Sequence, residues 1–363
     1  MVLKMSNTKK TTRVPEIELM KAIAIIAMVM VHVLEGSLNV FENAWELPGS
    51  IPYTLIEFFG GIPAAGVFTF AMGWGAAFSD RSTPISYLKR AFKLGLLLFY
   101  VNFVYAILPG LLDPADFGAF SEHPYAIIGF NIYSLATICM LFFALMKKLA
   151  DKPAARAVIC LAVVVAIFAA SILVPAEGVT SGNPWIDTLI GIFVRQNHYS
   201  WFPMVPWAIF PVMGYGFGLL YRRWEDRKRF ALASLGIGAV VVGVSQAVII
   251  TSGMPNASMN PGWVTEIDYY ALTPWNIVCA CGMVCLEMAI AFGIMTLAGG
   301  KLHPVLSDLS KNVMEMFVAH WIFVSPLYLL LIHVTSIWIN AAVGIVVFVL
   351  TYAVVRLWNK VRN

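Results

Sequence analysis

The chain has 363 residues, of which 60% are hydrophobic and only 12% are charged, and its formal net charge is +4. Soluble domains average about 25% charged residues and roughly half apolar residues. So few charged side chains cannot cover the surface of a water-soluble fold of this size. The composition therefore excludes a soluble protein and predicts an integral membrane protein.

About ten apolar stretches follow one another along the chain, each of roughly 20 residues or more, which is enough for a helix to cross a ~30 Å hydrocarbon core. They predict an all-α polytopic membrane protein in which residues 1–363 form a single domain. The predicted spans lie near residues 16–36, 57–79, 87–110, 124–148, 154–174, 199–221, 230–252, 273–299, 310–332 and 335–358. The apolar stretch 185–194 is too short to span and predicts a re-entrant or interfacial helix.

The basic residues predict the orientation of these spans. With ten spans, alternate connections face opposite sides, and every Lys and Arg except Arg195 falls on the side of the two termini. The positive-inside rule assigns that side to the cytoplasm. No small-residue cleavage site is evident near the first span, so an uncleaved, multi-pass protein of the cell (inner) membrane is expected.

The cysteines and glycines predict packing in place of metal or phosphate sites. All five cysteines lie in apolar stretches, so no disulfide framework is expected. Cys281 and Cys285 share a helical face, but no further ligands with metal-site spacing lie nearby, and helix packing is favoured over a metal. Gly73 and Gly75 likewise predict close helix contacts.

Ionisable side chains within the predicted spans are functional candidates, because a charge in the membrane costs several kcal/mol unless it faces a polar interior. These residues are His32, Glu35, Glu57, Glu287, Glu315 and His320. His32 is the preferred general base, since imidazole exchanges a proton near neutral pH; a histidine bonded to a backbone carbonyl is the equally weighted alternative. For His320 packing is at least as well supported as substrate contact, and for Glu287 and Glu315 a structural role is favoured.

A polar cluster of Arg195 and His198 lies at the outer end of the sixth predicted span. One interpretation is an interfacial anchor, together with Trp201 and Trp207 as aromatic-belt residues. The other is a clamp on a substrate oxygen. The isolation of Arg195 on an otherwise acidic outer face favours the clamp.

The first span has a recognisable order of residues: Arg13, then the acid-hydrophobe-acid step from Glu16 to Glu18, then a Lys, an apolar run and His32. This order resembles the opening of the transmembrane acyltransferases, a superfamily that includes the acyltransferase-3 proteins and the catalytic domain of heparan-α-glucosaminide N-acetyltransferase. Ala22 stands where the family usually has Gly.

Three further stretches resemble the same superfamily, at residues 58–73, 200–216 and 306–320. The last one corresponds to a segment that usually has the form Asn-Ser-Leu-x-x-Tyr-x-x-His. Here Asn312 and His320 are kept, whereas Val313 and Phe317 replace the usual Ser and Tyr.

The resemblance implies a membrane acyltransferase that moves an acyl group, most simply acetyl, from cytoplasmic acyl-CoA to a hydroxyl or amine of a sugar or glycan on the outer side. The candidate residues are His32 and Glu18 for catalysis, Arg13, Lys21, Arg90 and Lys93 for the acyl-CoA phosphates, and Arg195, His198, Tyr199, Trp201, His320 and Asn312 for the acceptor. The acidic outer face argues against a polyanionic acceptor. Membrane lipid is an expected partner, whereas nucleic acid is not. No metal cofactor is expected, and the chain can be a monomer or a homo-oligomer.

Two other functions remain as alternatives. One is a transporter or exporter of a small polar metabolite, with His32 and Glu287 as a proton relay. It predicts interrupted helices in two related halves, and the sequence contains no such repeat. The other is a structural or sensor membrane protein, which would leave the placement of His32 and Arg195 without a purpose.

Overall fold

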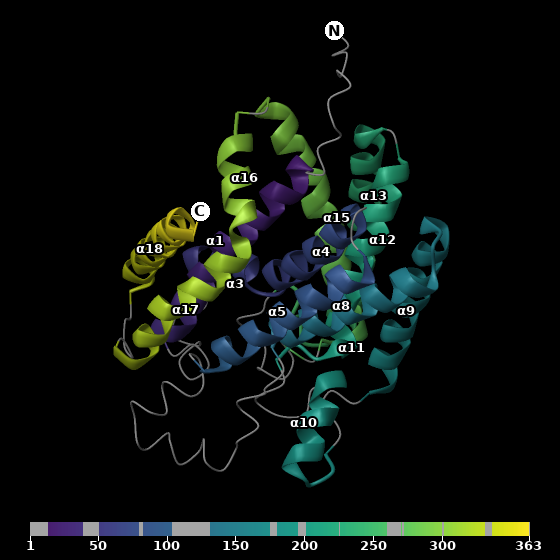
Figure 1. Cartoon of the computed structure of the whole chain (residues 1–363), viewed down its shortest axis with the longest axis horizontal. Helices are drawn as coiled ribbons and strands as arrows, with labels where there is room; N and C mark the ends of the chain where they lie inside the picture. The colour runs from purple at the N-terminus through teal and green to yellow at the C-terminus, as the bar shows by residue number, and fades with distance from the viewer. Residues whose placement is uncertain are drawn as a thin grey trace.

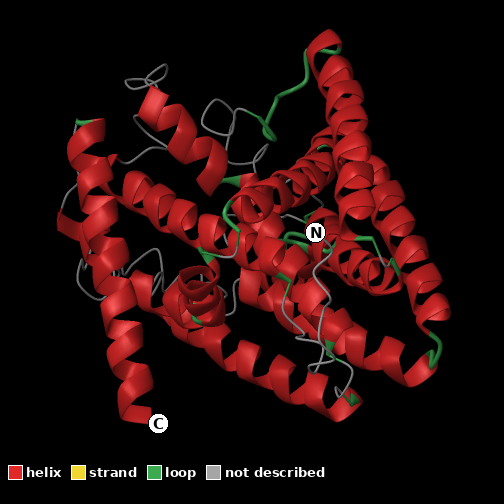
Figure 2. Ribbon diagram, turned by 90° about the horizontal axis from the view of Figure 1, so that it is seen from above, coloured by secondary structure: helices red, strands yellow, loops and turns green. Residues whose placement is uncertain are grey.

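The computed structural model describes residues 14–38, 51–79, 83–103, 131–174, 180–194, 201–224, 226–259, 270, 272–299, 301–330 and 336–362. This described part contains helices and no strands (Figures 1 and 2). Its helices are α1 (Pro15–Leu38), α3 (Ile51–Gly60), α4 (Ile62–Phe78), α5 (Pro84–Asn102), α8 (Ile132–Leu149), α9 (Pro153–Leu173), α10 (Pro184–Phe193), α11 (Met204–Trp207), α12 (Ile209–Arg223), α13 (Arg227–Thr251), α15 (Pro274–Leu297), α16 (His303–Lys311), α17 (Val313–Leu330) and α18 (Ile337–Arg362). The predicted all-α class is confirmed.

Eight helical segments of the described chain are long and apolar enough to cross a membrane, which supports the polytopic architecture. The third predicted span corresponds to α5, which is less apolar because it carries Lys89, Arg90 and Lys93. The ninth corresponds to α17, whose described apolar part is the shorter Val313–Leu327. The count of ten spans and the cytoplasmic placement of the termini stay predictions. The helix α10 is a short apolar helix that corresponds to the predicted short helix at 185–194.

Several helices begin at residues that satisfy the free backbone N–H groups of the first turn. The side chains of Thr83, Asn131, Asn183, Asp226 and Thr273 each accept a hydrogen bond from such an N–H group. These local signals set where the helices start, whereas packing decides which face each helix buries.

The helix α1 is the centre of the bundle. It packs against α3, α4, α15, α16, α17 and α18. In its apolar span 67% of the residues are buried, against 17% in the span of α9. A helix that is apolar all round but mostly exposed in the protein faces lipid, so α9 is peripheral and α1 carries the polar groups that the interior holds.

Glycines permit the closest helix crossing, between α4 and α12. A Cβ atom on Gly73 would lie 1.8 Å from the carbonyl oxygen of Pro211, and one on Gly214 would lie 2.0 Å from the carbonyl oxygen of Phe70. Only a residue without a side chain fits such a backbone contact. The packing predicted for the pair is confirmed at Gly73 and wrong at Gly75, where an added Cβ atom would meet no atom of another helix within 4 Å.

Candidate active site

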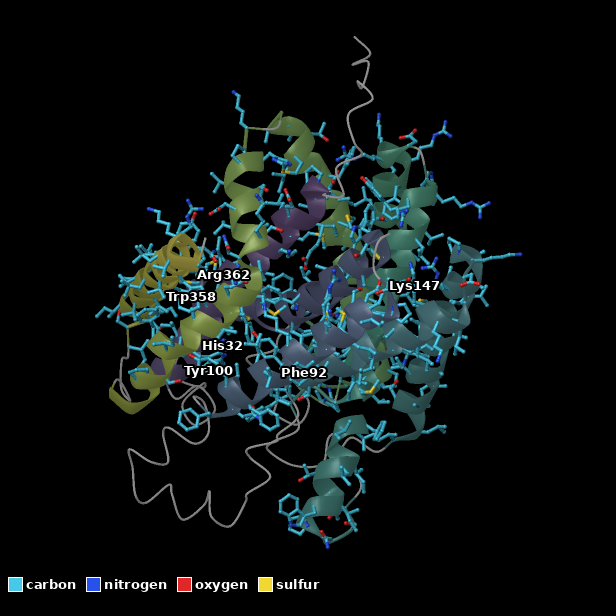
Figure 3. All side chains as sticks on the ribbon, in the orientation of Figure 1. His32, Phe92, Tyr100, Lys147, Trp358 and Arg362 are labelled. Carbon is cyan, nitrogen blue, oxygen red and sulfur yellow. The ribbon has the colours of Figure 1, made fainter. Side chains whose placement is uncertain are left out.

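Two histidines far apart in the sequence meet between α1 and α17. His32 Nδ1 and His320 Nε2 are 2.9 Å apart, and the ring planes are nearly parallel, with centroids 5.2 Å apart and an interplanar angle of 11°. His320 is fully buried and His32 is partly exposed. Figure 3 shows His32 beside α17, inside the bundle. The structure thus joins the preferred general base to one of the predicted substrate-contacting residues.

The hydrogen bonds of this pair assign the proton positions. His320 Nδ1 lies 2.5 Å from the backbone carbonyl oxygen of Phe317. Because a carbonyl only accepts, His320 Nδ1 carries a proton and donates it. A fully buried ring is most stable when neutral, so its Nε2 is an acceptor and receives the proton of His32 Nδ1. The Nε2 atom of a neutral His32 is then unprotonated, which is the state that a general base needs.

Aromatic rings hold both imidazoles in place. Trp321 lies with its ring centroid 4.6 Å from that of His32 and 4.9 Å from that of His320. The Phe317 ring meets His320 edge to face, with centroids 5.3 Å apart. Contacts of this kind restrict the ring orientations, so the pair is held in position before any ligand binds.

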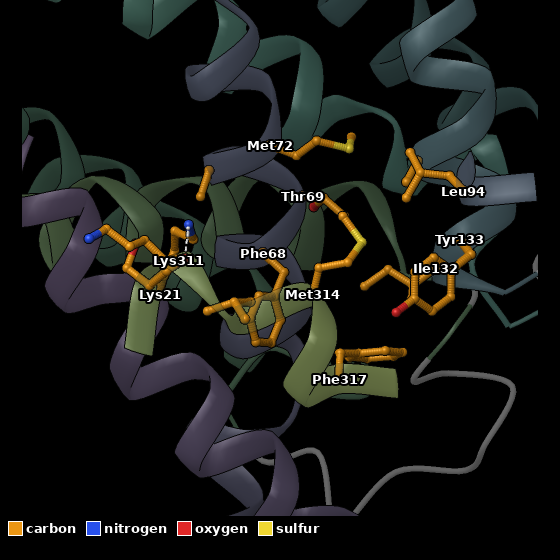
Figure 4. Close-up of a pocket in the computed structure, with 14 residues that line it drawn as sticks. Lys21, Phe68, Thr69, Met72, Leu94, Ile132, Tyr133, Lys311, Met314 and Phe317 are labelled. Carbon is orange, nitrogen blue, oxygen red and sulfur yellow. Dashed lines mark hydrogen bonds between the residues drawn. The ribbon is translucent and has the colours of Figure 1, made fainter. Parts of the chain in front are cut away.

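A cavity of about 300 Å³ lies between α1, α4, α5, α8, α16 and α17 (Figure 4). It is lined by Lys21, Phe68, Thr69, Ala71, Met72, Leu94, Ile132, Tyr133, Ala136, Ser310, Lys311, Val313, Met314 and Phe317. Lys21 and Lys311 lie at one end, and Tyr133 and Phe317 lie at the other. Since the Phe317 ring also contacts His320, the apolar end of the cavity lies one ring away from the histidine pair. A cationic end and an apolar interior suit an elongated ligand with an anionic head.

The cations predicted to bind the donor have different positions. The ammonium of Lys21 lines the cavity and donates to the backbone oxygen of Ser310, 2.7 Å away. Arg90 and Lys93 are exposed on α5, and the Arg90 guanidinium lies 5.8 Å from the ring centroid of Tyr87. Arg13 lies outside the described residues.

The acidic pair of the first span lies at the other end of α1. Glu16, only 1% exposed, forms an ion pair with Arg227, and Glu18, 4% exposed, has an Oε2 atom 3.5 Å from His303 Nε2. Glu18 precedes His32 by 14 residues, which is about 21 Å along a helix axis. The structure therefore does not bring Glu18 to His32. Both carboxylates are in the first turn of α1, where the helix dipole favours negative charge.

The residues predicted to bind the acceptor are mostly remote from the histidine pair or outside the described chain. Asn312 joins α16 to α18, because its Nδ2 donates to the oxygen of Asp308 and its Oδ1 accepts from Asn359, both at 2.8 Å. Trp201 is partly exposed just before α11. Arg195, His198 and Tyr199 lie outside the described residues, as do the side chains of Glu35 and Glu57.

The belt interpretation of Trp207 is wrong. Its side chain is completely buried, and its Nε1 donates to the backbone oxygen of Tyr270 at 2.9 Å. Phe202 and Phe210 pack against it. Residues 206–210, which are all buried, thus form a packing element inside the protein.

Several residues of the site could not be recognised as site residues from the sequence. Lys311 and Tyr133 reach the cavity from α16 and α8, and Phe317 contributes a backbone carbonyl that any residue type would supply. Arg227 and His303 become partners of the α1 acids only through the fold. Among the described residues, no group of three or more His, Cys, Asp or Glu is arranged to hold a metal ion.

One comparison with known proteins gives a match. A family model described as an acyltransferase domain matches residues 14–356, a range that includes both histidines and the whole cavity lining. No curated protein and no solved structure matches the chain.

Proposed function

Because the chain belongs to the acyltransferase-3 family, whose model covers nearly its whole length, we propose that it transfers an acyl group, most simply acetyl, from acyl-CoA to a hydroxyl or amine of a sugar or glycan. The observation that carries this proposal is the histidine pair. His32 is bonded to His320, which leaves its Nε2 unprotonated, and Phe317, which contacts His320, lines a cavity with a cationic end. The membrane is a cell (inner) membrane in this proposal, with the donor on the cytoplasmic side and the acceptor on the outer side.

The donor is proposed to bind in the cavity. The phosphates of acyl-CoA bind Lys21 and Lys311, since ammonium groups form strong charge-assisted hydrogen bonds to phosphate. The thioester arm extends between apolar residues toward Phe317. Arg90 and Lys93, on the helix that supplies Leu94, attract the anionic headgroup to this end, together with Arg13.

The chemistry follows from the proton positions. His32 Nε2 takes the proton of the acceptor hydroxyl, and the acceptor oxygen attacks the thioester carbonyl carbon. A new C–O bond forms, the C–S bond breaks, and the sulfur takes the proton back from His32 to leave as the free thiol. While His32 is an imidazolium, its Nδ1–H donates to His320 Nε2, and that bond is stronger because the donor is charged.

The remaining candidates have indirect or acceptor-side roles in this proposal. Arg195, His198, Tyr199 and Trp201 contact the acceptor. Glu18 and Asn312 hold the ends of α1 and α17 through the contacts described above and act as positioning residues.

The test is the release of CoA thiol from acetyl-CoA by detergent-purified protein, with and without a panel of sugars. The wild type is expected to show acceptor-stimulated release, and His32→Ala is expected to lower it by roughly 10²–10⁴-fold, the usual effect of removing a general base. His303→Ala is the matched control, because it removes a histidine that contacts the other end of α1 and retains release per folded molecule. An absence of release from monodisperse wild type with every donor and acceptor would instead favour the transporter.

A further inference from the structure

The hydroxyl group of Tyr133 is an unusual feature of the cavity. The side chain is 4% exposed, and its oxygen has no hydrogen-bond partner in the part of the chain that the structure describes. A buried hydroxyl without a partner lowers stability, so a phenylalanine would be the better residue for packing alone. Thr69, another hydroxyl of the lining, donates to the backbone oxygen of Ala65 at 2.9 Å.

The backbone around Tyr133 is firmly held. Its N–H donates to Asn131 Oδ1 at 2.8 Å, in a capping box that also includes Ser134. Asn131 Nδ2 in turn donates to Asn102 Oδ1 on α5 at 2.8 Å. A side chain at such a fixed helix start is presented in a defined position.

The ring of Tyr133 lies at the catalytic end of the cavity. It meets the Phe317 ring edge to face, with centroids 5.0 Å apart, and Phe317 contacts His320. Figure 4 shows the hydroxyl oxygen directed into the space near Phe317 and Met314. Other buried hydroxyls without a partner in the described chain, at Thr137, Ser325 and Thr351, are not part of the lining. The missing partner of Tyr133 is thus most simply a group of the ligand.

We infer that Tyr133 is a further catalytic residue, whose hydroxyl donates a hydrogen bond to the carbonyl oxygen of the acyl thioester; this rests on the acyl transfer proposed above. When the acceptor oxygen attacks the carbonyl carbon, the electron pair of the C=O bond moves to that oxygen, and the hydrogen bond strengthens. The pair returns when the C–S bond breaks. Tyr133 keeps its proton throughout, and His32 carries the proton between acceptor and sulfur.

Protein atoms cover the hydroxyl oxygen of Tyr133, so the ligand must displace a lining side chain to reach it. Met314 is suited to this movement, because it lines the cavity, is 39% exposed and has an unbranched, flexible side chain. The donor is therefore expected to shift Met314 when it binds.

The test compares Tyr133→Phe with wild type and with Tyr87→Phe in kcat, KM for acetyl-CoA and Tm. The removal of one donor to a developing oxyanion lowers kcat by roughly 10²–10³-fold, so Tyr133→Phe is expected to lose about that factor with little change in KM. Its Tm is expected to stay the same or rise, because the lost hydroxyl had no partner. Tyr87→Phe loses a buried bond to the oxygen of Ala76, 2.8 Å long, and is expected to lower Tm while it retains kcat.

The outcomes separate the two proposals. A Tyr133→Phe protein with wild-type kcat overturns the role of Tyr133 and leaves acyl transfer intact. A Tyr133→Phe protein that loses Tm and activity together, with no fall in kcat per folded molecule, shows a structural role and also overturns it. A wild type without any acyl transfer overturns both.

Discussion

The two ends of α1 bury ionisable side chains in opposite ways. At its start, Glu16 and Glu18 contact Arg227 and His303, so each acid has a basic partner. Near its other end, His32 contacts a second histidine, and the proton positions leave a nitrogen lone pair unused. A basic partner offsets the charge of a buried acid, whereas the neutral histidine pair retains a group that can take a proton. The first arrangement holds helices together, and the second can perform chemistry.

This comparison shows why an ionisable residue in an apolar segment does not by itself reveal a catalytic role. Glu18 and His32 are on one helix and belong to one motif, yet Glu18 contacts His303 whereas His32 contacts His320. The partner decides the role, and the partner comes from another helix.

Among the variants that test this comparison, the largest effect is expected at His320, which positions His32. His320→Phe removes the acceptor of the His32 Nδ1 proton, so the His32 ring loses the hydrogen bond that fixes its orientation, and a misplaced base costs on the order of 10²-fold in kcat. His320→Gln offers an amide oxygen to the same proton and is expected to recover part of the loss. The measurement is kcat and KM of both variants beside His32→Ala. Equal activities for His320→Phe and wild type would contradict the positioning role.

A smaller effect, on stability, is expected at the start of α1. Arg227→Ala leaves Glu16 buried without its partner; since Arg227 is half exposed, the loss is expected below the range for fully buried pairs, at about 2 kcal/mol. The double variant Arg227→Ala/Glu16→Gln removes the unpaired charge and is expected to regain much of the lost stability. Thermal unfolding in detergent measures the stability of the single and the double variant.

The control for this experiment is turnover per folded molecule, which Arg227→Ala is expected to leave unchanged. A loss of kcat in Arg227→Ala without a loss of Tm would reverse the assignment and make the acidic end catalytic. A wild-type Tm would show that the ion pair does not anchor α1.

The smallest effect is expected at a carboxylate that is hydrogen-bonded but not buried. Asp187 on α10 accepts from the backbone N–H of Ser181 at 2.7 Å, and this bond is the main reason that its pKa lies below the ordinary 3.8. A lowered pKa means that the stabilisation is fully present above the ordinary value and is lost as the pH falls through the lowered one. Amide hydrogen exchange at residues 181–187 should therefore quicken in acid, and in Asp187→Asn at neutral pH. A fall in the global Tm of Asp187→Asn would show that this exposed carboxylate matters as much as Glu16.

The sequence by itself determined the helical membrane class and the short helix at α10, and it singled out His32 and Lys21 as candidates. These follow from local properties: the length and polarity of a segment, the residue that caps it, and the presence of an ionisable group where lipid disfavours one. The segment around His320 was also identified, through its resemblance to a family pattern.

Only the tertiary structure decided which groups meet. His32 and His320 are 288 positions apart, and the cavity is lined by Lys21, Tyr133 and Lys311 from three different helices. The proton positions depend on the Phe317 carbonyl, which no side-chain pattern encodes. Gly73 and Gly75 differ for the same reason, since only one of them faces α12. Packing with distant segments sets the rotation of each helix about its axis. Because these helices are apolar on nearly all faces, the hydrophobic periodicity of the sequence carries little information about that rotation.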